Sequence, residues 1–223
     1  MASHGLSDTR SAIADACARA GIAVDAVTLL VVSKQRSDED VLRIYGEGQR
    51  LFAENREQGI RHRIDAQLPD DIEWHFVGPL QSRKVPYVSN HVKLLHSMDR
   101  IRLAEKWSAR SDVPVLLQFN MASEDQKSGF NPADADRVMH EVLDLGVVVR
   151  GVMAIPPIAV DPEETRPWFA DLRRIFDRYS ATYPGIDVCS MGMSNDFGVA
   201  IEEGATMVRI GRAIFAETER PES

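Results

Sequence analysis

The sequence predicts an α/β fold: a single (β/α)₈ TIM barrel of eight parallel strands, with an extra helix before the first strand. Short β-branched runs alternate with segments of helical spacing along the chain. The strand-like runs are continuously apolar, which is typical of strands buried on both faces of a parallel sheet. The chain of 223 residues also suits one barrel, typically about 250 residues. We therefore expect one domain over residues 1–223; a doubly wound open sheet is the alternative.

The eight expected strands are short and apolar. In chain order they are Thr28–Val32, Leu51–Ala53, Trp74–Val77, Leu94–His96, Val115–Phe119, Val148–Ala154, Asp187–Ser190 and Met207–Ile210. The second strand is weak on its own. Each strand but the last precedes a segment with helical spacing, and this alternation favours closure into a barrel.

Capping residues mark where several helices begin. Ser37 with Asp40 resembles a capping box, and Asn131 followed by Pro132 indicates an N-cap with proline at the first helical position. An apolar stripe over residues 168–179 predicts another helix.

The two ends of the chain differ from the repeating pattern. A leading helix is expected before the first strand, with Gly21 closing it. Little chain follows Phe215, so the eighth helix is expected to be vestigial.

Composition excludes several classes of protein. The net charge of −8 and the pI of about 5.3 argue against nucleic-acid binding. Cys17 and Cys189 are far apart and form no disulfide framework, and residues 1–10 lack the pattern of a signal peptide. No apolar run approaches the ~18 residues of a membrane span, and the histidines lack metal-ligand spacing. We expect a soluble, cytoplasmic protein without a metal site.

Lys34 is the first candidate for chemistry. It lies two residues beyond the first expected strand, at the carboxyl end where such barrels build their active sites. An amine nucleophile needs desolvation or a nearby cation to be neutral near pH 7, and the rim of a dry barrel mouth would desolvate it. The other lysines lie in outer helices, before a strand or in a polar loop: Lys84, Lys93, Lys106 and Lys127. Position favours Lys34 as a Schiff-base lysine; a solvated rim lysine is the alternative.

Two segments near the end of the chain indicate an anion site. Residues 190–196 follow the seventh strand, where Gly192 permits close backbone approach and the amides of Ser194 and Asn195 are expected at a helix N-terminus. Residues 208–213 lie at the end of the eighth strand. Barrels frequently bind phosphate between these two loops, although a capped strand–turn–helix junction would look the same.

Asn55 and His75 lie at or just past the ends of the second and third strands, where either could orient a ligand. A core histidine with a satisfied hydrogen bond explains His75 equally well.

Ordered motifs along almost the whole chain resemble the pyridoxal phosphate homeostasis proteins (the YggS/PROSC family). The matching segments are Val32-Ser33-Lys34, Phe52-Ala53-Glu54-Asn55, Trp74-His75-Phe76-Val77-Gly78, Leu80-Gln81-Ser82, His96-Ser97, Gln118-Phe119-Asn120, Lys127-Ser128-Gly129-Phe130, Ser190-Met191-Gly192-Met193-Ser194 and Val208-Arg209-Ile210-Gly211. The match is specific because the motifs are many and in order; no single one would suffice.

The resemblance implies a barrel similar to the N-terminal domain of alanine racemase, with pyridoxal 5'-phosphate (PLP) joined to Lys34. Ser194 and the Gly211 region would hold the phosphate, and Arg209 would face the pyridine nitrogen. Three more residues would line the pocket: Asn55, His75 and Met193. Lys127 matches a family lysine that would be a secondary PLP contact.

This chain departs from the family at several positions. Arg212 replaces a threonine after Gly211, Arg36 replaces a second lysine, and Ala216 replaces a glycine. Pro79 and Arg83 replace a histidine and an asparagine. A hydroxyl contact to phosphate is lost at Arg212, where the backbone N–H and the guanidinium could substitute.

The resemblance implies a PLP carrier rather than an enzyme with robust turnover. Arg209 would keep the ring nitrogen unprotonated and weaken the electron sink. The chain ends 13 residues after the eighth strand, at Ser223, before the C-terminal domain that supplies a second base in racemase-like enzymes. We expect a monomer whose partners are PLP and PLP-dependent apo-enzymes, without nucleic acid or membrane. A racemase-like PLP enzyme acting on amino acids, a class I aldolase using Lys34, and an interaction protein without a ligand are the alternatives.

Overall fold

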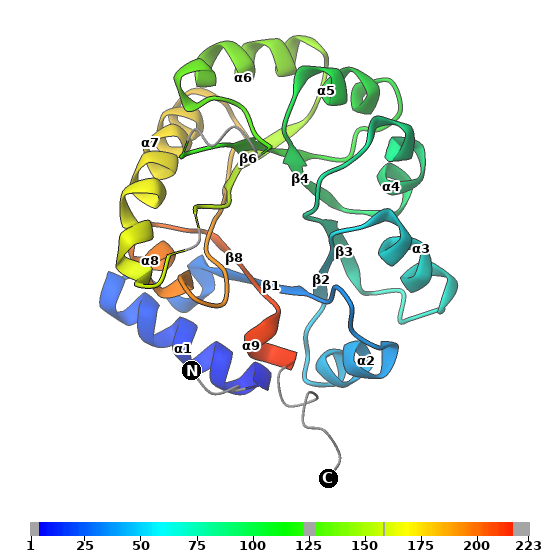
Figure 1. Cartoon of the computed structure of the whole chain (residues 1–223), viewed down its shortest axis with the longest axis vertical. Helices are drawn as coiled ribbons and strands as arrows, with labels where there is room; N and C mark the ends of the chain where they lie inside the picture. Colours follow the sequence, from blue (N-terminus) through cyan, green and yellow to red (C-terminus); the bar gives the residue numbers. More distant parts are fainter. Residues whose placement is uncertain (1–4, 123–127, 158, 216–223) are drawn as a thin grey trace.

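Eight parallel strands close into a barrel in the computed structural model, which describes residues 5–122, 128–157 and 159–215 (Figure 1). The strands are β1 (Thr28–Val32), β2 (Leu51–Glu54), β3 (Glu73–Phe76), β4 (Leu94–Met98), β5 (Val115–Phe119), β6 (Val149–Ala154), β7 (Val188–Ser190) and β8 (Met207–Ile210). They follow chain order around the ring, and β8 pairs with β1 from Thr28↔Met207 to Val31↔Ile210. The predicted barrel is confirmed, and the open sheet is wrong because this last pairing closes the ring.

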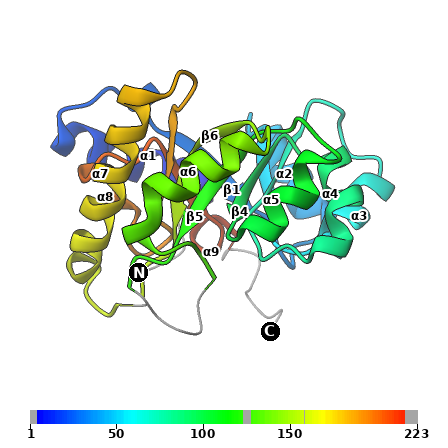
Figure 2. The same ribbon diagram turned by 90° about the horizontal axis from the view of Figure 1, so that it is seen from above.

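The helices form an outer ring around the strands, as the view in Figure 1 and the perpendicular view in Figure 2 show. They are α1 (Gly5–Ala20), α2 (Asp38–Gly46), α3 (Glu57–Asp65), α4 (Val85–His91), α5 (Ile101–Ser108), α6 (Ala135–Asp144), α7 (Arg166–Thr182), α8 (Phe197–Glu202) and α9 (Arg212–Phe215). Four 3₁₀ turns accompany them: η1 (Val24–Ala26), η2 (Ser82–Lys84), η3 (Pro132–Asp134) and η4 (Pro162–Thr165). The leading helix is α1, which packs against α8 and α9.

The expected caps are present. The Ser37 side chain accepts a hydrogen bond from the Asp40 amide at 3.1 Å, which satisfies one of the free N–H groups at the start of α2. Asn131 caps in the same way, but the turn it caps is η3, which leads into α6. Gly21 follows α1 with φ of +68°, a left-handed conformation that favours glycine at the end of a helix.

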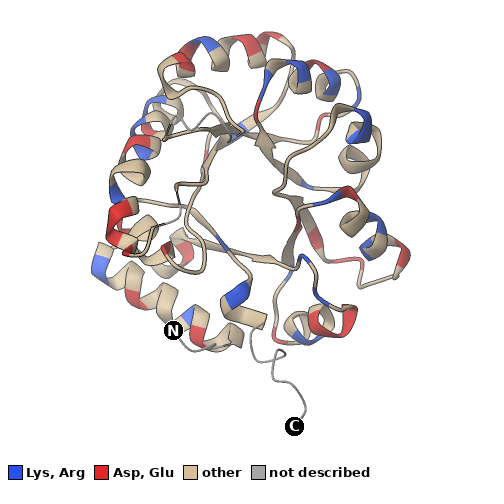
Figure 3. Ribbon diagram, viewed as in Figure 1, with Lys and Arg blue, Asp and Glu red and all other residues tan. Residues whose placement is uncertain are grey.

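Charged side chains gather on the outer helices, and the strands carry few of them (Figure 3). The barrel interior is filled by one apolar cluster whose buried members are Leu30, Ala53, Leu94, Leu116, Met153, Val188 and Met207. Side chains two residues apart on a strand share a face. Polar side chains follow at that spacing on four strands, and all four are buried: His96, Gln118, Ser190 and Arg209. The interior therefore becomes polar toward the carboxyl ends of the strands, where barrel proteins place their sites.

Candidate functional site

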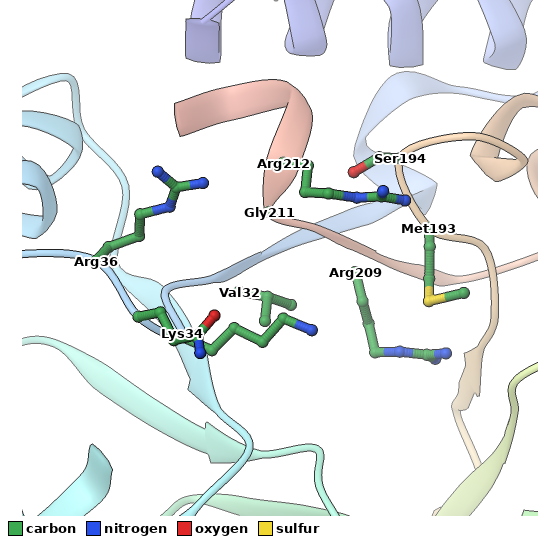
Figure 4. Close-up of a pocket in the computed structure, with 9 residues that line it drawn as sticks. Val32, Lys34, Arg36, Met193, Ser194, Arg209, Gly211 and Arg212 are labelled. Atoms are coloured by element: carbon green, nitrogen blue, oxygen red, sulfur yellow. The ribbon is translucent and has the colours of Figure 1, made fainter. Parts of the chain in front are cut away.

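A pocket of about 510 Å³ opens at the carboxyl ends of β1 and β8. It is lined by Val32, Lys34, Gln35, Arg36, Met193, Ser194, Arg209, Gly211 and Arg212 (Figure 4). Five of the seven predicted site residues therefore come together here, from three segments distant in sequence. Its charged lining residues are all cationic, although the chain as a whole is acidic. The lining thus favours an anionic ligand.

Lys34 reaches into the pocket from the turn after β1, and its side chain runs below Val32 toward Arg209 (Figure 4). The expected desolvation of the amine is not found, because the turn carries Lys34 beyond the strand end and leaves it exposed. The next residue, Gln35, has φ of +61°. Residues with a Cβ rarely adopt this conformation, so the turn is held by its surroundings.

The loop after β7 is built around Met193. Gly192 has φ of +90°, and a Cβ there would come within 2.6 Å of the Ala200 Cβ, so glycine is required. The Met193 amide donates to Asp196 Oδ1 at 2.6 Å, and the Met193 carbonyl accepts from the Asp196 and Phe197 amides. Burial raises the pKa of the Asp196 carboxyl.

Ser194 lies on this loop and faces the pocket from the side opposite Lys34 (Figure 4). The sequence predicted the Ser194 and Asn195 amides at a helix N-terminus. Helix α8 begins only at Phe197, so the two amides lie in the turn before the helix. Within the described part of the chain, neither amide donates a hydrogen bond to the protein. Both N–H groups remain available to an anion.

Gly211 directly follows β8 and lies against the end of β1 at Val32. A Cβ at this position would come within 2.7 Å of the Val32 carbonyl oxygen, so the close approach of the two strand ends requires glycine. The Gly211 carbonyl accepts from the amides of Ile214 and Phe215. Arg212 follows at the pocket wall, with its side chain directed toward Met193 and Ser194 (Figure 4).

Arg209 forms the buried wall of the pocket. Its Nη1 donates to the Ser190 carbonyl at 2.8 Å and to Ser190 Oγ at 2.7 Å, and its Nη2 donates to the Ala154 carbonyl at 2.9 Å. Burial lowers its pKa to about 10, so the guanidinium stays protonated at neutral pH. A fixed positive charge therefore borders the pocket from inside the barrel.

A chain of buried hydrogen bonds continues from Arg209 across the barrel. Ser190 Oγ lies 3.1 Å from His96 Nδ1, and His96 Nε2 lies 3.1 Å from His75 Nδ1. Arginine can only donate, so Ser190 Oγ accepts from Arg209 and keeps its hydroxyl hydrogen free to donate to His96 Nδ1. When Ser190 donates in this way, His96 Nε2–H donates to His75 Nδ1.

The two histidines in this series of hydrogen bonds, His75 and His96, are uncharged at neutral pH. Burial, with the positive charge of Arg150, lowers the pKa of His75 to about 4. Burial, with His75 and Arg209 nearby, lowers the pKa of His96 well below its usual value. The sequence singled out His75 but missed the roles of His96 and Ser190. Their positions, two residues beyond the apolar interior positions of β4 and β7, were the available signal.

Asn55 and His75 lie apart from the other predicted site residues. Asn55 borders a separate hollow with Gln81 and Lys84, and its carbonyl oxygen would lie 2.0 Å from a Cβ at Gly78. His75 is 4% exposed and reaches Arg209 only through His96 and Ser190. Their direct contact with a cofactor stays a prediction.

The remaining expectations concern metals, membranes and two positions without a described structure. Over residues 5–122, 128–157 and 159–215, no group of three or more His, Cys, Asp or Glu side chains is placed to share a metal ion. The described helices include none that is both long and apolar enough to span a bilayer. Lys127 and Ala216 lie outside the described residues.

Comparison with known proteins agrees with this barrel fold. The family model of the alanine racemase N-terminal domain matches residues 15–219. Pyridoxal phosphate homeostasis proteins of Aquifex aeolicus and Escherichia coli K12 are 39% and 38% identical, over 95% of this chain and 96% and 94% of theirs. The solved structure of PipY from Synechococcus elongatus with PLP bound gives a TM-score of 0.76 at 32% identity, covering 91% of this chain and 99% of that one. This chain therefore belongs to the pyridoxal phosphate homeostasis protein family.

Proposed function

We propose that this protein binds PLP in the pocket at the β1–β8 corner and holds it as a Schiff base on Lys34. The observation that carries the proposal is the convergence of a primary amine, two glycine-built loops and a buried arginine on one pocket. The relatives named above are pyridoxal phosphate homeostasis proteins, and the PipY structure contains PLP.

The residues present fit such a ligand. Gly211 leaves room at a point where a Cβ would contact the Val32 carbonyl, and Gly192 opens the neighbouring loop. Ser194 supplies a hydroxyl and a backbone N–H without a protein partner among the described residues. Arg212 adds a guanidinium to the same wall. These groups would hold a phosphate by hydrogen bonds to a charged acceptor.

PLP supplies an aldehyde that condenses with a primary amine, with loss of water, to give a Schiff base. Lys34 provides that amine from the wall opposite Ser194 (Figure 4). Arg209 stays protonated and would face the ring nitrogen, which disfavours a second positive charge there. Asn55, His75 and Met193 complete the proposed set, with Met193 in the pocket itself.

The proposed role is that of a carrier without robust turnover. Arg209 is protonated near neutral pH and so offers no base there, and His75 and His96 are neutral and buried behind it. A reactive aldehyde held on Lys34 is kept from other amines and can be released to apo-enzymes. We place this role in the cytoplasm, in a monomer with one domain over residues 1–223.

A titration with PLP tests the binding. Wild-type protein should develop a visible absorption band at one equivalent, and Lys34→Arg should not, because a guanidinium keeps the charge but forms no Schiff base. An equal band in the variant would contradict the assignment of Lys34.

Transfer tests the carrier role. PLP-loaded protein should restore activity to a PLP-dependent apo-enzyme, and no amino acid should be racemised at a rate above that of free PLP. Loaded protein that activates no apo-enzyme, or that turns over amino acids rapidly, would contradict the role.

A further inference from the structure

A buried arginine lies directly beneath the turn that carries Lys34. Arg63 comes from α3, is 3% exposed, and is not among the residues that line the pocket. Its Nη2 donates to the Ser33 carbonyl at 3.1 Å and to the Arg36 carbonyl at 2.7 Å. One guanidinium nitrogen therefore holds the backbone on both sides of Lys34 and Gln35.

The same guanidinium is fixed by two carboxylates. Arg63 Nε donates to Glu54 Oε1 at 3.1 Å, and Nη1 donates to Asp38 Oδ1 at the start of α2. Glu54 is also buried, at 3% exposed, and its Oε1 accepts from Ser33 Oγ at 2.9 Å. A Cβ at Gly59 of α3 would come within 2.6 Å of Glu54 Oε2, so the helix has a glycine where the carboxylate packs.

The turn needs this support. It is closed by the Arg36 amide donating to the Ser33 carbonyl at 3.1 Å, with Gln35 in the left-handed conformation at φ of +61°. Such a conformation persists where neighbouring groups impose it. Within the described part of the chain, the Lys34 side chain has no hydrogen bond or ion pair of its own. The turn therefore sets the point from which the Lys34 side chain reaches into the pocket.

We propose that Arg63 is the positioning residue for Lys34: with Glu54 it holds the Ser33–Arg36 turn so that the amine lies in the pocket before PLP binds. This inference rests on the proposed function. Arg63 does not contact the pocket and acts through the Ser33 and Arg36 carbonyls. Holding the amine in place reduces the ordering cost of forming the Schiff base.

Arg63→Lys is the sharpest variant, because it keeps the buried positive charge opposite Glu54 and removes the planar fork that reaches two carbonyls. The matched control is Arg61→Lys on the same helix, where Arg61 is half exposed and pairs with Glu57. Each variant is titrated with PLP and with pyridoxine 5'-phosphate, which has the phosphate and ring but no aldehyde. Amide hydrogen exchange of a peptide covering residues 33–37 is measured without ligand.

Arg63→Lys should weaken Schiff-base formation about tenfold, the size expected for losing a hydrogen bond to a charged donor. Its affinity for pyridoxine 5'-phosphate should stay within about twofold, and the turn should exchange about tenfold faster. Arg61→Lys should match wild type in all three measurements. Equal weakening of both ligands would overturn the proposal, since it would indicate a general structural role.

The exchange measurement separates this inference from the proposed function. Wild-type protein that forms no Schiff base would contradict the function. The exchange rates would then still decide whether Arg63 holds the turn, because they need no ligand. If residues 33–37 exchange at the same rate in Arg63→Lys as in the wild-type protein, the positioning role is overturned, whether or not the protein forms a Schiff base.

Discussion

Two corners of the same pocket are built by different means. The lysine corner, comprising the Ser33–Arg36 turn with Glu54 and Arg63, is held by charged side chains buried under the turn. The anion corner, residues 192–196 and 209–212, is shaped by backbone approach at Gly192 and Gly211. The comparison teaches that one corner depends on charge compensation and the other on the absence of a Cβ. Variants should therefore damage the two corners in different ways.

The largest effect is expected at the lysine corner. Glu54→Ala should remove the buried one of the two carboxylates that pair with Arg63, leaving only the partly exposed Asp38, and lower the free energy of unfolding by about 3 kcal/mol. The exposed pair between Arg150 and Asp187 provides the control, and Asp187→Ala should cost about 1 kcal/mol or less. Urea denaturation measures both. Similar small losses in the two variants would show that the buried pair does not support the turn.

The two buried histidines behind Arg209, His96 and His75, should make stability depend on pH. His75 has a folded pKa of about 4 against an ordinary 6.5, so between these values the unfolded state binds more protons. The contribution is complete above pH 6.5 and falls by about 3 kcal/mol as the pH drops to 4. His96 acts in the same direction.

Urea denaturation at several pH values between 7 and 4 measures this slope. His75→Gln should reduce it, because one of the two titrating groups is gone. An unchanged slope in the variant would mean that His75 is already charged or exposed in the folded protein.

A glycine pair tests the anion corner. Gly192 and Gly185 have nearly the same backbone, with φ of +90° and +88°, but only at Gly192 would a Cβ meet a neighbour. Both alanine variants carry the conformational strain, and Gly192→Ala adds crowding against Ala200 and Phe197. We expect it to lose about 1–3 kcal/mol more than Gly185→Ala.

Binding of pyridoxine 5'-phosphate should weaken in Gly192→Ala alone. Equal affinity in the two variants would show that the loop shape does not matter for the anion.

The smallest effect is expected from a single hydroxyl. Ser194→Ala should weaken pyridoxine 5'-phosphate about tenfold, or about 1.4 kcal/mol, because one hydrogen bond to a charged acceptor is lost. Ser180→Ala, on the exposed face of α7, serves as the control and should change nothing. Stability should be the same in both variants. Unchanged affinity in Ser194→Ala would show that the Ser194 hydroxyl does not contribute to phosphate binding and that backbone N–H groups hold the anion instead.

The order of elements was predictable from the sequence because it depends on local signals. The bounds of β1, β5 and β8 agree at both ends with the expected runs, since most residues of each run are apolar. The β4 strand continues to Met98, two residues past the expected end, because His96 and Ser97 are buried despite being polar.

The site was predictable only in part. Lys34, Ser194 and Gly211 follow strand ends, Arg209 lies one residue before the end of β8, and the barrel brings strand ends together. Arg63 gave no such signal, because its importance comes from three-dimensional contacts to Ser33 and Arg36, some thirty residues away. The exposure of Lys34 agrees with the solvated rim lysine that was the alternative, and sequence position could not decide between the two because it does not show how far a turn carries a side chain.

The central claim is that PLP is held on Lys34, and borohydride reduction of the PLP-treated protein followed by peptide mass mapping tests it most directly. Reduction fixes the linkage between cofactor and amine. The account predicts one phosphopyridoxyl group, on the peptide containing Lys34, with the other four lysines unmodified. Modification spread over several lysines, or its absence from Lys34, would contradict the account.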